Sequence, residues 1–217
     1  MKKIAISILT LLMSLNLCAQ KARDFFASMP DSLTPLLTAV NKADFIDFMD
    51  SNMKAEITNR FSQKSEMTRL TDDFIELKMS PEATWQLKVL PLSDGSQVVC
   101  IAYTTCATAC DSHLKFFDDD WKELPISRFV SNFPTIDDFF TSVPDSVNAN
   151  RFMTYRSQVD MLLTRAVLSP EVQTLTFEFT TPTTLDAETA DFLKPYIREE
   201  VVYQWRDEKF QKTAMAQ

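Results

Sequence analysis

The sequence predicts an α+β fold in which helices pack a four-stranded antiparallel meander. Between residues 68 and 121, short segments of alternating apolar and polar residues are separated by turn residues, as in consecutive strands. Residues 42–59 instead place apolar residues at three- and four-residue steps, which is typical of a helix with one buried face. Mixed helix and strand patterns return after residue 126 and predict a second, diverged α+β unit.

The pattern of the first nineteen residues is typical of an export signal. Lys2 and Lys3 precede an uncharged apolar run, residues 4–17, and Ala19 offers a cleavage site before Gln20. We therefore expect export to the periplasm or the cell surface. A lipid anchor at Cys18 is the alternative, disfavoured because lipoprotein signals place a small side chain where this chain has Leu17. No other stretch is apolar enough to cross a membrane.

Composition excludes several classes of function. The net charge is −8, and it becomes −10 once residues 1–19 are removed, because they carry Lys2 and Lys3 and no acid. A nucleic-acid or anionic-lipid surface needs the opposite sign. The chain has one glycine, Gly95, so neither a Walker loop nor a dinucleotide fingerprint can form. No cofactor is expected.

The lead-in to the meander is predicted to be helical. Asp31-Ser32 would cap a short helix reaching Val40, and a longer helix would follow over residues 42–59. Asp44, Asp47 and Asp50 lie along one side of the longer helix. A row of helical carboxylates is more often a solvated face than a cation site, because calcium sites need loop oxygens.

The meander contains four expected strands. They are residues 74–79, 85–89, 97–105 and 113–117. Asp94-Gly95 between two apolar runs is a strong hairpin signal, since glycine accepts a positive φ. The strand over residues 97–105 is apolar on both faces and therefore belongs in the middle of a sheet.

The boundary between units is placed near residue 125, giving a first unit over residues 20–125 and a second over residues 126–217, which could also pack together as one domain. The second unit is predicted to contain helices at 136–141, 145–156 and 187–194, a hairpin of 159–168 with 172–180, a strand at 200–205 and a frayed tail after Phe210. Ser-Pro-Glu at residues 80 and 169, and Pro-Asp-Ser at residues 30 and 144, recur in both halves. Duplication and shared turn chemistry both explain such repeats.

Three cysteines and the one histidine cluster at the end of the meander. Cys106 and Cys110 would face each other across a tight turn, so a disulfide is favoured in an oxidising compartment. Cys100 would then be a buried apolar side chain. Two alternatives remain: all three thiols reduced, or a metal-binding hairpin formed by Cys106, Cys110 and His113.

Histidine-based acid–base chemistry would have to use His113. Asp111-Ser112-His113 contains the residue types of a hydrolytic triad, but neighbours on a strand point to opposite faces. A structural strand histidine is therefore favoured, and a hydrolase using His113 with a nearby acid is the alternative function. Asp118-Asp119-Asp120 lacks the glycine and glutamate of a calcium loop and reads as a strand terminator.

Several segments resemble an uncharacterised secreted family of the Bacteroides group. They are Met29-Pro30-Asp31-Ser32, Pro35-Leu36-Leu37, residues 44–48, residues 50–55, Leu70-Thr71, residues 87–91, Asp111-Ser112 and residues 116–121. The family is a domain of unknown function, so the resemblance implies no activity or site. The layout of helices before a meander is also similar to the β-lactamase-inhibitor-protein-like fold. The leading interpretation is a non-catalytic binding module of the bacterial envelope with a protein or small-molecule partner.

Overall fold

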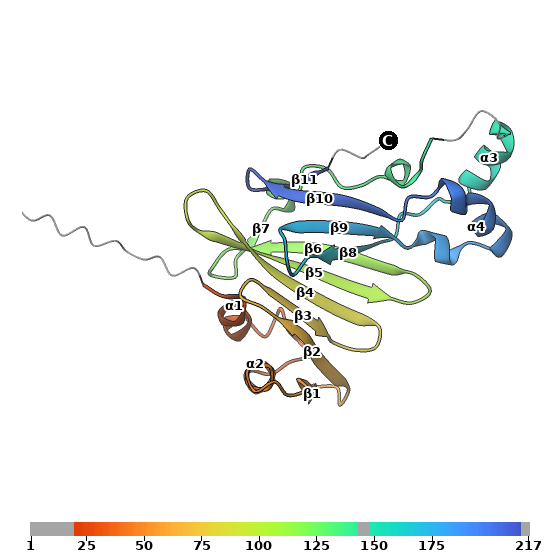
Figure 1. Ribbon diagram of the computed structural model, residues 1–217. Coiled ribbons are helices and arrows are strands. Elements are labelled where there is room, and N and C mark those ends of the chain that lie inside the picture. Colours follow the sequence, from red (N-terminus) through yellow and green to blue (C-terminus); the bar gives the residue numbers. More distant parts are fainter. Residues whose placement is uncertain (1–19, 143–147, 214–217) are drawn as a thin grey trace, which may run out of the picture.

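The computed structural model describes residues 20–142 and 148–213 as an α+β protein with two antiparallel sheets (Figure 1). Sheet A contains, in spatial order, β1 (Glu56–Thr58), β2 (Lys64–Leu70), β3 (Phe74–Lys78), β4 (Ala83–Pro91), β5 (Gln97–Cys106), β6 (Cys110–Phe117) and β7 (Glu123–Leu124). Sheet B has the order β11 (Lys209–Lys212), β10 (Glu200–Arg206), β9 (Thr174–Phe179) and β8 (Thr164–Leu168). The predicted fold class is confirmed.

The helices are short. They are α1 (Ala22–Ser28), α2 (Ala39–Asp50), α3 (Ala149–Arg156) and α4 (Ala187–Leu193), with 3₁₀ turns η1 (Ile126–Arg128), η2 (Ile136–Phe139), η3 (Thr181–Thr184) and η4 (Lys194–Tyr196). In the described part of the chain, no helix has the length and apolar character needed to span a membrane.

The four predicted strands correspond to β3, β4, β5 and β6, and each pairs with the next in antiparallel register. Gly95 has φ +87°, as the turn between β4 and β5 requires. The sheet is nevertheless wider than the predicted meander, because β1, β2 and β7 add to its edges. Polar residues dominate β2, and a register shift between Met67 and Arg69 breaks its alternation, so its local pattern does not predict a strand.

The predicted helix over residues 31–40 is wrong. That segment consists of isolated turns, and α2 begins only at Ala39. Thr38 is the actual N-cap, since its hydroxyl accepts the Asn41 N–H at 3.0 Å while the Asn41 side chain accepts the Thr38 N–H. The longer predicted helix, residues 42–59, ends earlier in the structure, at Asp50. Asn52, with φ +53°, follows its end, and residues 56–58 form β1 instead.

The two faces of sheet A are both covered. Alternation along β5 sends Val99 and Ile101 into a core shared with α1 and α2, and it sends Cys100 and Ala102 into a second core shared with sheet B. Figure 1 shows α1 and α2 beside β1–β3 and sheet B beside β5 and β6. Burial on both faces explains why β5 is the most apolar strand of the meander.

The backbone N–H groups on the outer edge of β8 are hydrogen-bonded to side chains from sheet A. The N–H groups of Thr164, Ala166 and Leu168 point away from β9 and would otherwise lack partners. They donate, in that order, to Asp111 Oδ1 at 3.3 Å, Ser112 Oγ at 2.9 Å and Gln86 Oε1 at 2.8 Å. Sheet B therefore docks edge-first on sheet A through alternate backbone groups.

The opposite edge of sheet B is covered by backbone. Phe210 in β11 donates its N–H to Phe129 O at 2.7 Å, and Ser131 donates to Phe210 O at 3.2 Å. The segment just after η1 thus runs along β11 as an additional short partner. The outer edge of β11 is thus covered at Phe210, and that of β8 at three N–H groups.

The two predicted units share a core. Its buried members include Phe74, Cys100 and Phe116 from sheet A and Phe177, Tyr203 and Phe210 from sheet B. The two halves therefore pack together through one apolar layer. The residue boundary at 125 stays a prediction.

The second half follows the predicted order of elements, with differences at the ends. The expected helix at 136–141 is the 3₁₀ turn η2, and Thr135 at its N-cap position donates its N–H to Asp138 Oδ2 at 2.8 Å. The hairpin of β8 and β9 forms as predicted. The helix predicted from residue 145 starts at Ala149, and residues 143–147 lie outside the described residues. The tail prediction is wrong for residues 211–212, because they belong to β11, which pairs with β10.

The recurring Ser-Pro-Glu segments occupy equivalent turns. Ser80 Oγ accepts the N–H of Glu82 at 3.2 Å between β3 and β4, and Ser169 Oγ accepts that of Glu171 at 3.3 Å between β8 and β9. A hydroxyl that caps a backbone N–H two residues later is ordinary turn chemistry. This repeat therefore needs no duplication, and the second Pro-Asp-Ser lies outside the described residues.

The turn between β5 and β6 carries a disulfide. Cys106 and Cys110 are cross-strand partners in the register of the two strands, and their sulfur atoms are bonded. Cys100 is buried between the sheets, and this burial raises the pKa of its thiol. We refer to residues 106–110 as the disulfide loop.

Replacing Gln86 by leucine tests the edge-first docking of sheet B. Gln86 is 6% exposed, so the variant would leave the Leu168 N–H buried without an acceptor. We expect the free energy of unfolding in urea to fall by about 1–3 kcal/mol. Gln63→Leu in the exposed β1–β2 turn is the matched control, with an expected change within about 0.5 kcal/mol. Equal losses in the two variants would contradict the docking role.

Thiol labelling tests the cysteine assignment. In protein beginning at Gln20, an alkylating reagent should modify no cysteine under native conditions, because Cys100 is buried and the other two are bonded. Denaturant alone should expose Cys100 only, and denaturant with a reductant should add Cys106 and Cys110. Mass spectrometry of the intact protein counts the labels. Labelling of Cys106 without a reductant would show that the loop is reduced.

Candidate ligand-binding pocket

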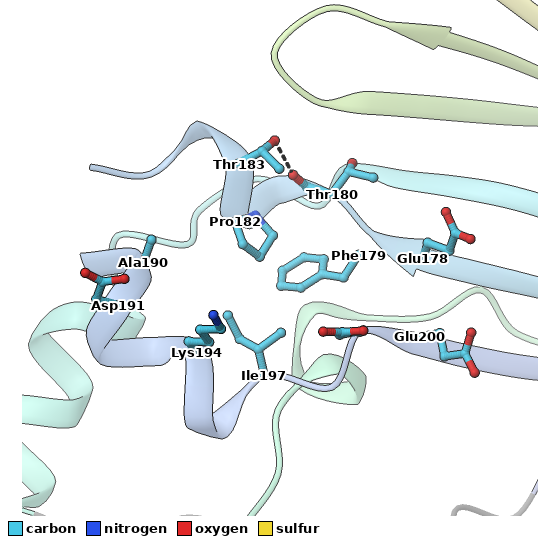
Figure 2. Close-up of a pocket in the computed structure, with 11 residues that line it drawn as sticks. Glu178, Phe179, Thr180, Pro182, Thr183, Ala190, Asp191, Lys194, Ile197 and Glu200 are labelled. Carbon is cyan, nitrogen blue, oxygen red and sulfur yellow. Dashed lines mark hydrogen bonds between the residues drawn. The ribbon is translucent and has the colours of Figure 1, made fainter. Parts of the chain in front are cut away.

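A pocket of about 600 Å³ lies at one end of sheet B, where β9 runs into η3 and η4 leads into β10 (Figure 2). We call it the acidic pocket. It is lined by Glu178, Phe179, Thr180, Pro182, Thr183, Ala190, Asp191, Lys194, Ile197, Glu199 and Glu200. The lining comes from one continuous stretch of chain, residues 178–200, which leaves the sheet and returns to it.

Local sequence signals fix the walls of this pocket. Pro182 lies in the first turn of η3, where its missing N–H costs nothing. Asp186 caps α4, because its carboxylate accepts the Thr189 N–H at 3.0 Å. Hydrogen bonding by the Thr189 side chain, and then by its backbone N–H, keeps the pKa of Asp186 below its ordinary value. Pro195 then lies in η4, directly after α4. Two prolines and one helix cap thus determine the shape of the connection between the antiparallel strands β9 and β10.

The pocket has an apolar floor. Phe179 is 9% exposed and stacks on Phe139 with ring centroids 4.6 Å apart, so its ring is held in place. Figure 2 shows this ring in the middle of the pocket, with Pro182 and Ile197 beside it. A ligand in the pocket would therefore meet hydrocarbon at its centre.

Carboxylates surround that floor. The eleven lining residues, all in the described part of the chain, include Glu178, Asp191, Glu199 and Glu200 against one ammonium, that of Lys194. Glu178 and Glu200 are direct cross-strand partners on β9 and β10, an arrangement that costs stability for like charges. Arg165 offsets it in part, with its Nη1 3.7 Å from Glu178 Oε2. The potential in the pocket is therefore negative.

A second, smaller pocket of about 370 Å³ lies between η2 and α3. Its charged groups satisfy each other, since Arg156 pairs with Asp137 at 2.6 Å and lies over the Phe140 ring at 4.3 Å. With its charges paired internally, this pocket offers a ligand less than the acidic pocket does.

The disulfide loop lies against the wall of the acidic pocket but not inside it. Thr183 Oγ1 donates to Thr108 O at 2.9 Å, and Thr180 Oγ1 donates to Cys110 O. Because Cys106 and Cys110 are bonded to each other, they offer no thiolate pair to a metal. Across residues 20–142 and 148–213, no group of three potential metal ligands comes together. The geometry therefore gives the metal-binding alternative no support.

His113 lies on the exposed surface of β6 and lines neither pocket. Its ring stacks on Tyr103 at 4.8 Å, and Tyr103 packs edge-on against Trp85. Burial raises the pKa of Tyr103 to about 12, helped by the charge of Glu123. The neighbouring Asp111 and Ser112 are engaged by the N–H groups of β8. The geometry therefore gives the hydrolase alternative no support.

The other acidic clusters have structural roles. Asp50, at the end of the α2 row, forms a bidentate pair with Arg23 at 2.9 Å, and the hydrogen bond lowers its pKa. Asp118 Oδ1 accepts the N–H groups of Asp120 and Lys122 and so caps the turn after β6. These contacts agree with their interpretation as a solvated helix face and a strand terminator.

Sequence reasoning did not identify the acidic pocket. Its carboxylates are spread over twenty-three residues of chain, and only the turn between β9 and β10 brings Glu178 opposite Glu200. One local signal was present. The run Thr180-Thr-Pro-Thr-Thr184 between a strand and a helix marks a structured loop, and such loops often carry binding sites.

Comparison with known proteins identifies the family but no activity. One solved structure, described as a domain of an uncharacterised protein from Porphyromonas gingivalis W83, has a TM-score of 0.74 and 24% sequence identity, and it covers 91% of this chain and 100% of its own. A likeness at this identity supports the fold alone. No curated protein matches the sequence. Residues 14–210 match DUF3256, described as a protein of unknown function, and the chain belongs to that family.

Proposed function

We propose that this protein is an exported, non-catalytic binding module of the bacterial envelope. The proposal places its ligand site in the acidic pocket. Export is supported by the charged and apolar pattern of residues 1–19 and by a disulfide suited to an oxidising compartment. The similarity in layout to the β-lactamase-inhibitor-protein-like fold stays a prediction and agrees with a binding role by analogy only.

One observation carries the choice of site: an apolar floor in a lining that has four carboxylates and one ammonium. Glu199, Glu200 and Asp191 have no ion pair within the described residues, and Glu178 has only the long contact with Arg165. Carboxylates accept hydrogen bonds and donate none. The complementary ligand therefore carries ammonium or guanidinium groups on an apolar stem.

Two kinds of ligand share that chemistry. One is a free polyamine, and the other is a lysine or arginine side chain on a partner polypeptide, whose methylene stem would lie over Phe179 while its charge reaches the rim. A nucleic acid or another polyanion would be repelled. Binding in either form requires no bond to be broken, which is consistent with a non-catalytic module.

Calorimetric titration with spermidine, a flexible trication, tests the proposed site. We expect the intact protein to bind it, and we expect Glu200→Gln and Glu199→Gln each to weaken binding about threefold to tenfold, because each removes one charge at the rim. Asp119→Asn is the control, since Asp119 is exposed in the turn after β6, outside the pocket lining. Citrate should not bind. Equal affinity for spermidine in all variants, or no binding at all, would contradict the site.

Expression of the full chain in a Gram-negative host tests export. The protein should be recovered from the envelope, and its intact mass should equal that of a chain starting at Gln20. We expect this because signal peptidase cleaves after small residues such as Ala19. A lipidated Cys18 would instead give a heavier, membrane-bound product. Replacing Leu11 by arginine interrupts the apolar run and should retain the precursor in the cytoplasm. Replacing the nearby Ser14 by threonine serves as the matched control.

A further inference from the structure

The acidic pocket and the disulfide loop share a wall. Thr180 and Thr183 line the pocket, and their hydroxyls donate to two carbonyls of the disulfide loop, Cys110 O and Thr108 O. Figure 2 shows the β5–β6 hairpin lying over this part of η3. These two bonds link the pocket wall in sheet B to the end of a hairpin in sheet A.

The other side of η3 is anchored separately. Thr181 Oγ1 accepts the Leu163 N–H and donates to Met161 O, both at 2.8 Å, so this residue is held by the segment that leads into β8. Thr183 also donates to Thr180 O, which keeps the turn itself closed. Thr180 is also held by its N–H, which donates to Leu163 O at 3.1 Å. The disulfide loop therefore contributes the hydroxyl contacts of Thr180 and Thr183, while Thr181 acts as a fixed point.

The position of the loop carbonyls depends on the disulfide. Ala107 and Thr108 are exposed, and inside the loop Ala107 N donates to Ala109 O at 2.9 Å. Outside it, Cys106 N donates to Glu82 O at 2.8 Å. A loop with exposed backbone and few apolar contacts opens at low free-energy cost. The covalent link between Cys106 and Cys110 fastens the base of this loop, where the two residues are also register partners of β5 and β6.

We propose that the Cys106–Cys110 disulfide regulates the acidic pocket, so that the pocket keeps its binding form while the bond is intact and loosens when it is reduced. This inference rests on the proposed function for its ligand, but the coupling of loop to wall is a separate claim. The reductant is a dithiol. Its two sulfurs lose two electrons and two protons and become a disulfide, and the S–S bond of the protein is replaced by two S–H groups.

Hydrogen exchange of the intact, folded protein tests the coupling. Treatment with dithiothreitol under native conditions should raise amide exchange in residues 106–110 and also in η3, because the carbonyls that hold Thr180 and Thr183 become mobile. Exchange in β1 and β2, far from the loop, should stay unchanged. Unchanged exchange in η3 after complete reduction would overturn the proposal.

A variant that leaves both cysteines in place gives a second test. Thr183→Val removes the hydroxyl that donates to Thr108 O while keeping the shape of the side chain. It should raise exchange in η3 of the oxidised protein, as reduction does. Thr184→Val is the matched control, because its hydroxyl donates only to Thr181 O inside the same turn. Identical exchange in the two variants would contradict the link.

Spermidine binding separates this inference from the proposed function. If both hold, reduction should weaken binding at least about fivefold, a typical coupling between linked sites. If η3 responds to reduction but spermidine binds neither form, the cationic ligand is wrong and the coupling stands. If spermidine binds both forms equally and η3 does not respond, the pocket stands and the regulation is wrong.

Discussion

The edge of β8 is the constraint on which the architecture depends. Three buried N–H groups of that strand have no strand partner, and an unsatisfied buried donor costs more than an ordinary hydrogen bond contributes. Asp111, Ser112 and Gln86 supply the acceptors from the surface of sheet A. Because these acceptors come at fixed positions, they determine both where sheet B lies and in which register.

This docking also accounts for the polar residues at the end of the meander. Asp111 and Ser112 stand next to His113 and resemble parts of a hydrolytic site, yet their oxygens are engaged by the backbone of β8. Residue types that could carry chemistry are thus used to close a sheet edge. The docking of β8 on sheet A also brings the disulfide loop within hydrogen-bonding reach of Thr180 and Thr183. The Cys106–Cys110 bond therefore lies beside the acidic pocket.

In the acidic pocket, negative charges outnumber positive charges. Several charges elsewhere are paired locally, as in Arg23 with Asp50 or Lys115 with Glu123. Around Phe179 the carboxylates exceed the cations, and Glu178 faces Glu200 directly. Like charges held together without a local partner lower stability. A cationic ligand would relieve that repulsion, and this is the physical basis of the proposed ligand site.

Local pattern by itself determined the α+β class, the four strands β3–β6, the turn at Gly95 and the hairpin of β8 and β9, because alternation and turn chemistry act over a few residues. It failed for β1, β2 and β11, whose burial depends on what packs against them. Only the tertiary structure decided that sheet B docks through Gln86, Ser112 and Asp111, and that Glu178 meets Glu200. Those pairings join residues far apart in the chain, and no local rule of spacing specifies them.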